Sequence, residues 1–75
     1  MFRRMFERQI INKIEDETEY TFAYDPDVQF KNVDAIYIDF VLKGSAINDD
    51  FNYVDITVVG FLSENGIHIS TLLEK

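Results

Sequence analysis

Residues 53–73 read YVDITVVGFLSENGIHISTLL, and this stretch decides the fold. Apolar and polar residues alternate along both arms of the stretch, which is the period of a half-buried β-strand. Between the arms lies Asn65-Gly66, the residue pair that is favoured in a two-residue type I′ hairpin turn. The stretch therefore predicts a hairpin that joins strands at 53–62 and 66–73.

The register of this hairpin follows from the position of its turn. With Asn65-Gly66 as the loop, Leu62 opposes Ile69. A slip by one residue would move every side chain of one strand to the other face, so the apolar pattern and the turn together select this register. The register predicts that five apolar side chains share one face, which are Val58, Leu62, Ile67, Ile69 and Leu73.

Two segments upstream also have strand composition. Residues 33–43 place Ile36, Ile38, Phe40 and Leu42 on one face of a strand, and Gly44-Ser45 then favours a loop. Residues 18–24 alternate in the same way and end at the turn residues of 25–27. Residues 28–32 are interpreted as a loop or a ragged edge. Together with the hairpin, these segments predict a four-stranded antiparallel meander.

The N-terminal segment 2–14 is predicted to be an amphipathic helix. Its apolar side chains recur every four residues, at Phe2, Phe6, Ile10 and Ile14. Such a helix would cover the apolar face of the meander, which gives an α+β fold. The alternative is a strand in this segment, which would make it the fifth strand of a small all-β barrel.

The length of 75 residues predicts a single domain that spans residues 1–75. A chain of this size hides only about 60% of its unfolded surface, so a partner or a second copy would stabilise it. The chain has no cysteine and one histidine, His68, which is expected to face solvent on the last strand. We therefore expect no enzyme activity, no catalytic residues, no cofactor and no metal site. With no cysteine and no long apolar run, we expect a cytoplasmic protein that does not bind membrane.

Charge is distributed unevenly along the chain. The net charge is −7, but residues 1–13 carry +3 and residues 14–75 carry −10. A body this acidic repels nucleic acid and anionic membrane, so direct binding to either is not expected. The expected partner is a protein with a basic or apolar surface.

The second face of the predicted sheet carries the candidate binding site. If Leu42 opposes Val54, the carboxylates of Asp39 and Asp55 become diagonal neighbours on that face. They would flank an apolar patch of the kind that marks an interface. The predicted protein-interface residues are Tyr37, Val41, Val59, Phe61, Asp39 and Asp55.

These features predict a small acidic protein-interaction module that acts as an adaptor or as an inhibitor of a larger protein. One alternative is a nucleic-acid mimic that occupies a basic groove of a DNA- or RNA-handling protein. Another is a structural subunit of an assembly. We also expect a homodimer, in which the apolar patch would be buried between two copies.

Overall fold

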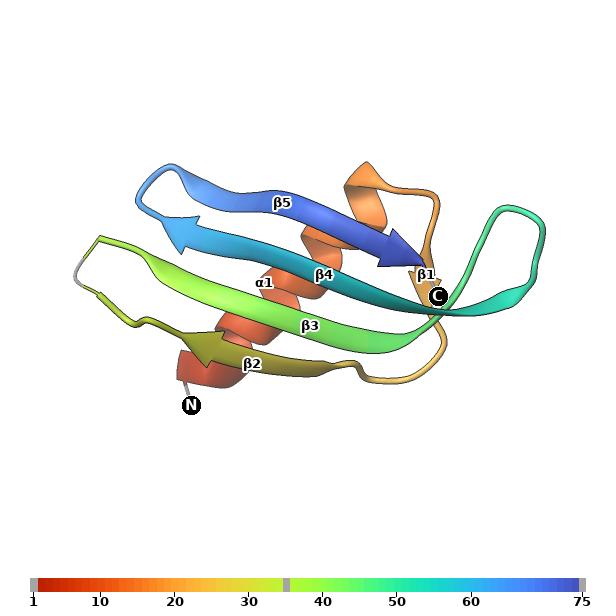
Figure 1. Ribbon diagram of the computed structural model, residues 1–75, viewed down its shortest axis with the longest axis horizontal. Coiled ribbons are helices and arrows are strands. Elements are labelled where there is room, and N and C mark those ends of the chain that lie inside the picture. The colour runs from red at the N-terminus through yellow and green to blue at the C-terminus, as the bar shows by residue number, and fades with distance from the viewer. Residues whose placement is uncertain (1, 35, 75) are drawn as a thin grey trace.

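The computed structural model describes residues 2–34 and 36–74, with side chains from residue 4 onward, and it contains one helix packed against an antiparallel sheet (Figure 1). The sheet is open and does not close into a barrel, so the α+β prediction is confirmed and the all-β alternative is wrong. The elements are α1 (Phe2–Glu17), β1 (Thr21–Phe22), β2 (Asp27–Lys31), β3 (Ile38–Ile47), β4 (Tyr53–Ser63) and β5 (Gly66–Glu74).

The sheet is a meander whose first edge is broken into two strands. Both β1 and β2 pair with β3, on the same edge, and β4 and β5 follow in chain order. The break lies around Pro26, which has no backbone N–H to donate to a neighbouring strand. The predicted strand at 18–24 is therefore reduced to two residues. The prediction of a loop or ragged edge at 28–32 is wrong, because residues 27–31 form β2.

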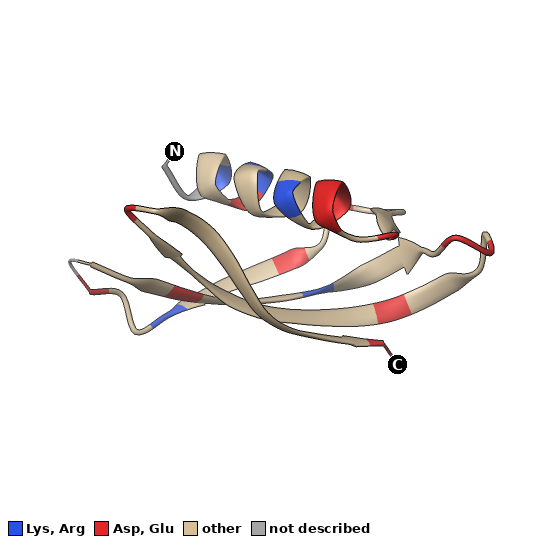
Figure 2. Cartoon of the chain, turned by 90° about the horizontal axis from the view of Figure 1, so that it is seen from above, with Lys and Arg blue, Asp and Glu red and all other residues tan. Residues whose placement is uncertain are grey.

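The helix covers one face of the sheet and leaves the other face open (Figure 2). Its side chains Ile10 and Ile14 are fully buried against the sheet. The chain after α1 is tied back to it, because the backbone N–H of Phe22 donates to a carboxylate oxygen of Glu15 at 2.9 Å. The core consists of Ile10, Ile14, Tyr20, Val28, Phe40, Leu42, Ala46, Ile56, Val58 and Leu62.

The β4–β5 hairpin exists, but its turn lies one residue earlier than the sequence predicted. Ser63 pairs with Gly66, so Glu64 and Asn65 form the loop. Only Gly66 of these residues has a positive φ, at 109°, whereas a type I′ turn needs positive φ at both central residues. Leu62 therefore pairs with Ile67, and the predicted pairing of Leu62 with Ile69 is wrong. The shift is by two residues, so the predicted faces at this end of the hairpin survive.

A bulge then separates the two ends of β5. Gly60 pairs with Ile69, whereas Val59 pairs with Thr71, which leaves Ser70 without an opposite residue. Beyond the bulge, the extra residue moves each side chain of β5 to the opposite face of the sheet from the one predicted. Leu72 therefore packs against the core, and Leu73 is 60% exposed, which corrects the prediction that Leu73 lies on the core face.

The strand β3 continues through the predicted loop at Gly44-Ser45. A Cβ at position 44 would lie 2.8 Å from Cβ of Pro26, which belongs to the broken edge of the sheet. This close approach requires glycine at position 44. Because β3 runs to Ile47, Leu42 pairs with Val58. The predicted pairing of Leu42 with Val54 is wrong by four residues.

Candidate functional site

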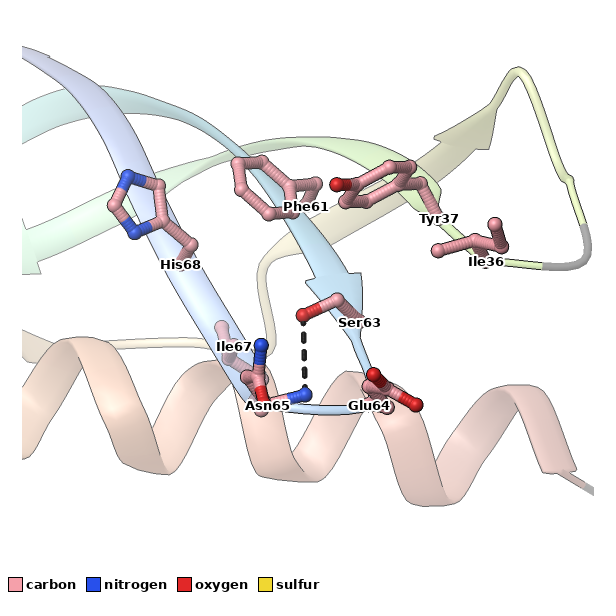
Figure 3. Close-up of a pocket in the computed structure, with 9 residues that line it drawn as sticks. Ile36, Tyr37, Phe61, Ser63, Glu64, Asn65, Ile67 and His68 are labelled. Carbon is pink, nitrogen blue, oxygen red and sulfur yellow. Dashed lines mark hydrogen bonds between the residues drawn. The ribbon is translucent and has the colours of Figure 1, made fainter.

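Three rings form a contiguous cluster on the helix-free face of the sheet (Figure 3). The rings of Tyr37 and Phe61 meet edge to face, with centroids 5.3 Å apart and planes at 85°. The imidazole of His68 lies on the other side of Phe61, with centroids 4.8 Å apart and planes at 31°. Both contacts fall in the range of favourable ring packing. We call Tyr37, Phe61 and His68 the ring cluster.

The strand pairing explains why these rings meet. Phe61 of β4 pairs with Asp39 of β3 on one side and with His68 of β5 on the other. Directly paired residues point to the same face, so His68 lies beside Phe61. Tyr37 precedes Asp39 by two residues in a chain that is extending into β3, which brings its ring to the same face.

A shallow pocket of about 310 Å³ opens beside the ring cluster. The cluster forms one wall, and the β4–β5 turn forms the other (Figure 3). The turn is held by its own hydrogen bond, because the backbone N–H of Asn65 donates to Oγ of Ser63 at 3.2 Å. The pocket therefore combines aromatic ring surface with a polar, fixed rim.

Five of the six predicted interface residues lie together on the helix-free face. Val41 pairs directly with Val59, which is 37% exposed, and this pair continues the apolar surface of the ring cluster along β3 and β4. Asp39 lies beside Phe61 and accepts a hydrogen bond from Nδ2 of Asn32 at 3.1 Å. We call the neighbouring residues Tyr37, Asp39, Val41, Val59, Phe61 and His68 the outer-face patch.

The sixth predicted residue, Asp55, lies apart from the patch. It pairs with Ser45, whose hydroxyl donates to Oδ1 of Asp55 at 3.0 Å. Asp55 lies six positions before Phe61 in β4, which corresponds to about 20 Å along a strand. The predicted juxtaposition of Asp39 and Asp55 is therefore wrong, because it depended on the incorrect β3–β4 register.

His68 is the member of the patch that sequence reasoning missed. Its exposure on the last strand agrees with the expectation, but its stacking on Phe61 was not foreseen. In the predicted register His68 lies opposite Ser63 and not opposite Phe61. Gly66 is the sequence feature that indicates the observed register. It predicts that register if it is interpreted as the positive-φ residue that follows a type I turn.

A second feature is a group of carboxylates at the opposite end of the molecule. The negative charge of Asp49 raises the pKa of Glu19, with smaller contributions from desolvation, a hydrogen bond to Asp49, Glu74 and Asp50. The carboxylates lie in three places in the chain, after α1, in the β3–β4 turn and at the end of β5. We call Glu19, Asp49, Asp50 and Glu74 the acidic end.

The β3–β4 turn in the acidic end has an exposed aromatic residue at its tip. Phe51 has φ of 62° and is 85% exposed. A bulky side chain in this left-handed conformation is unusual. Asn48 closes the turn, because its Oδ1 accepts from the backbone N–H groups of Asp50 and Asn52, both at 3.0 Å.

A hydrogen bond joins Tyr20 to Glu74 of the acidic end. The hydroxyl of Tyr20 donates to Oε2 of Glu74 at 2.5 Å. This bond, then burial, then the charge of Glu74, raises the pKa of Tyr20 from 10.0 to about 12. The folded state therefore holds the phenol proton at a pH where the unfolded chain has released it.

We expect stability to fall as the pH rises from 10 to about 12, and we expect Tyr20→Phe to remove part of this fall. Below pH 10 the phenol is protonated in both states, so the Tyr20 contribution is fully present there. Urea unfolding of both proteins at several alkaline pH values measures the difference. Identical alkaline slopes for wild type and variant would contradict the assignment.

Two features are absent from the described residues. Among them, no three His, Cys, Asp or Glu side chains are grouped as a metal site would require. In the same part of the chain, no helix has the length and apolar character needed to cross a membrane. The outer-face patch itself presents ring faces, ring edges and valine side chains.

The chain matches no protein-family model, no curated protein and no solved structure.

Proposed function

We propose that this protein is a small interaction module that binds a larger protein through its outer-face patch, as an adaptor or an inhibitor. The supporting observation is the position of the patch on the sheet face that the helix does not cover (Figure 2). Tyr37 is 49% exposed and Val59 is 37% exposed, and the ring of Phe61 contacts the rings of both Tyr37 and His68. Aromatic residues on a rigid surface are typical anchors of protein interfaces.

The chemistry of the patch defines the partner. The centre of the patch is apolar and aromatic, and Asp39 lies at its rim beside Phe61. The whole chain carries −7, which attracts a basic surface over distance. The proposed partner therefore presents an apolar surface with Lys or Arg around it. Apolar contact would provide most of the affinity, and charge would provide rate and orientation.

We expect Phe61→Asp to abolish partner capture, because it places a carboxylate at the centre of the apolar contact. Asn12→Asp is the matched control, since it adds the same charge at an exposed position of α1, on the opposite side of the sheet from the patch. Affinity capture with the wild type and both variants, followed by identification of the bound proteins, measures the effect. Equal capture of the same protein by wild type and Phe61→Asp would contradict the proposal.

The acidic end supports a second candidate, a nucleic-acid mimic that occupies a basic groove. Its carboxylates are close enough that Asp49 raises the pKa of Glu19. Such a mimic would lose its partner steeply as salt rises, whereas apolar contact would respond weakly. Capture that is lost in Asp49→Asn with Asp50→Asn, and kept in Phe61→Asp, would favour the mimic over the patch.

A further inference from the structure

The pocket beside the ring cluster lies between two chain connections at the same end of the sheet (Figure 1). Between β2 and β3, the backbone N–H of Asp34 donates to the backbone carbonyl oxygen of Tyr37 at 2.8 Å. Between β4 and β5, the backbone N–H of Asn65 donates to Oγ of Ser63 at 3.2 Å. Each wall of the pocket therefore contains a position that is fixed by a hydrogen bond within the chain, which lowers the ordering cost of binding.

The two walls of this pocket differ in chemistry. The ring wall provides the apolar surface and the π-electrons of Tyr37 and Phe61. The turn wall, on the opposite side of the pocket, provides hydrogen-bond acceptors on the side chains of Ser63, Glu64 and Asn65 (Figure 3). Glu64 and Asn65 are both exposed, so their acceptors are accessible. The pocket thus fits a ligand that has a flat surface on one side and N–H donors on the other.

The charge of the pocket selects the sign of the ligand. Among the described residues that line it, Glu64 carries the one carboxylate, and none is Lys or Arg. The whole chain carries −7, so an anion would be repelled both locally and over distance. A cation is attracted by the carboxylate and also by the faces of aromatic rings. Charge complementarity therefore favours a cationic ligand.

An apolar ligand and a large ligand both fit the pocket less well. An apolar ligand would remove water from Glu64, Asn65 and Ser63 and would supply no donors in return, which costs free energy. The volume of about 310 Å³ lies near the lower end of the range of about 300–1,000 Å³ for small-molecule pockets. This size suits one long side chain better than an organic cofactor.

We infer that this pocket binds an arginine side chain of the partner protein, with the guanidinium plane against the ring cluster and its N–H groups directed to Glu64. The inference rests on the proposed function and names the group of the partner that the patch recognises. A guanidinium is planar, stacks on aromatic rings and donates in a fixed fork that matches a carboxylate. A lysine ammonium is compact and strongly hydrated, so it would use the turn wall alone.

The pocket and the apolar part of the outer-face patch can be occupied by one partner. Tyr37, Phe61 and His68 belong to both. Val41 follows Tyr37 by four positions, which corresponds to about 13 Å along an extended chain. A partner that covers Val41 and Val59 with apolar side chains would therefore need only one arginine at the border of that contact to reach the pocket. Arginine is among the residues that most often anchor interfaces.

Nuclear magnetic resonance titration with short peptides tests the inference without the partner. The probe is acetyl-Gly-Arg-Gly-amide, at about pH 8, where histidine side chains carry little positive charge. We expect saturable shifts at Tyr37 and at residues 61–68, with a dissociation constant of about 1–10 mM. The arginine δ-methylene protons should shift upfield, because they lie over the ring faces. The same peptide with citrulline keeps the planar shape without the charge and should bind at least about fivefold more weakly, and so should the lysine peptide.

Two pairs of variants locate the peptide. Glu64→Gln should weaken the arginine peptide about two- to fivefold, as expected for an exposed ion pair. Its control is Asp50→Asn, which removes the same charge at the acidic end and should leave the affinity unchanged. Tyr37→Leu removes the ring but keeps an apolar side chain, and it should weaken binding by a similar factor. Its control is Tyr53→Leu, an exposed tyrosine at the far end of β4, which should bind as the wild type does.

Four results would overturn the inference. The first is an arginine peptide that causes no saturable shift at the pocket. The second and third are equal binding of the citrulline peptide and equal binding of the lysine peptide. The fourth is an equal loss in Glu64→Gln and Asp50→Asn, which would assign the binding to net charge. Partner capture does not enter this test. If the arginine site fails, capture can still depend on Phe61, and if the proposed function fails, the peptide affinities remain measurable.

Discussion

Replacing Gly60 with alanine is expected to destabilise the protein by about 3 kcal/mol, at the upper end of overpacking substitutions. A Cβ at this position would lie 2.2 Å from the backbone carbonyl oxygen of His68 and 2.8 Å from Cζ of Phe40. The carbonyl belongs to the neighbouring strand beside the bulge, so it can move only if the β4–β5 pairing changes. A chain of 75 residues has a total stability of about 4–11 kcal/mol, so this loss is large.

Urea unfolding of the wild type and Gly60→Ala measures the loss. The matched control is Gly66→Ala, where no atom lies within 4 Å of the new Cβ and the cost comes only from the positive φ of 109°. We expect this control to lose about 1–2 kcal/mol. Adding Phe40→Leu to Gly60→Ala should restore little stability, because the contact with the His68 carbonyl remains. A loss below about 1 kcal/mol for Gly60→Ala would contradict the packing described here.

Phe40→Ala is expected to cost about 4 kcal/mol, which is typical of deleting a buried phenylalanine side chain. Phe40 has no exposed surface and lies in the core that α1 covers, with its ring against Gly60. Glycine at position 60 and phenylalanine at position 40 are therefore complementary. The substitution would leave a cavity in the middle of the core, and the helix would lose packing there.

The same chain offers a matched control for this prediction. Phe51→Ala deletes the same side chain at a position that is 85% exposed, where we expect a change within about 0.5 kcal/mol. Urea unfolding of both variants gives the two energies, and near-ultraviolet circular dichroism reports whether tertiary packing is kept. Equal losses in the two variants would show that Phe40 does not hold the core together.

The sequence was sufficient for the kind of each element and for most of the faces. The helix and the three longer strands were predicted because apolar periodicity is a local property of the chain. Ile10 and Ile14 are both buried, as their spacing predicted. Five of the six predicted interface residues share a region of the helix-free face, because alternation along a strand fixes the face of each side chain.

The register of the sheet could not be predicted in the same way. Registers that differ by an even number of residues preserve every face, so the apolar pattern does not separate them. For this reason the pairing of Leu42 was wrong by four residues while its face was correct. The turn chemistry, which should decide between such registers, was misinterpreted at Gly66.

What the sequence determined by itself was the fold class, the meander topology of the sheet and the face on which the outer-face patch lies. What only the tertiary structure decided was which residues meet across strands. Asp55 lies outside the candidate site and His68 lies within it, because strand register is set by contacts between distant segments. Pro26 above Gly44, and the carbonyl of His68 above Gly60, are two such contacts. Neither is encoded in the local pattern of either segment, since each depends on the close approach of two backbones that only the folded chain brings together.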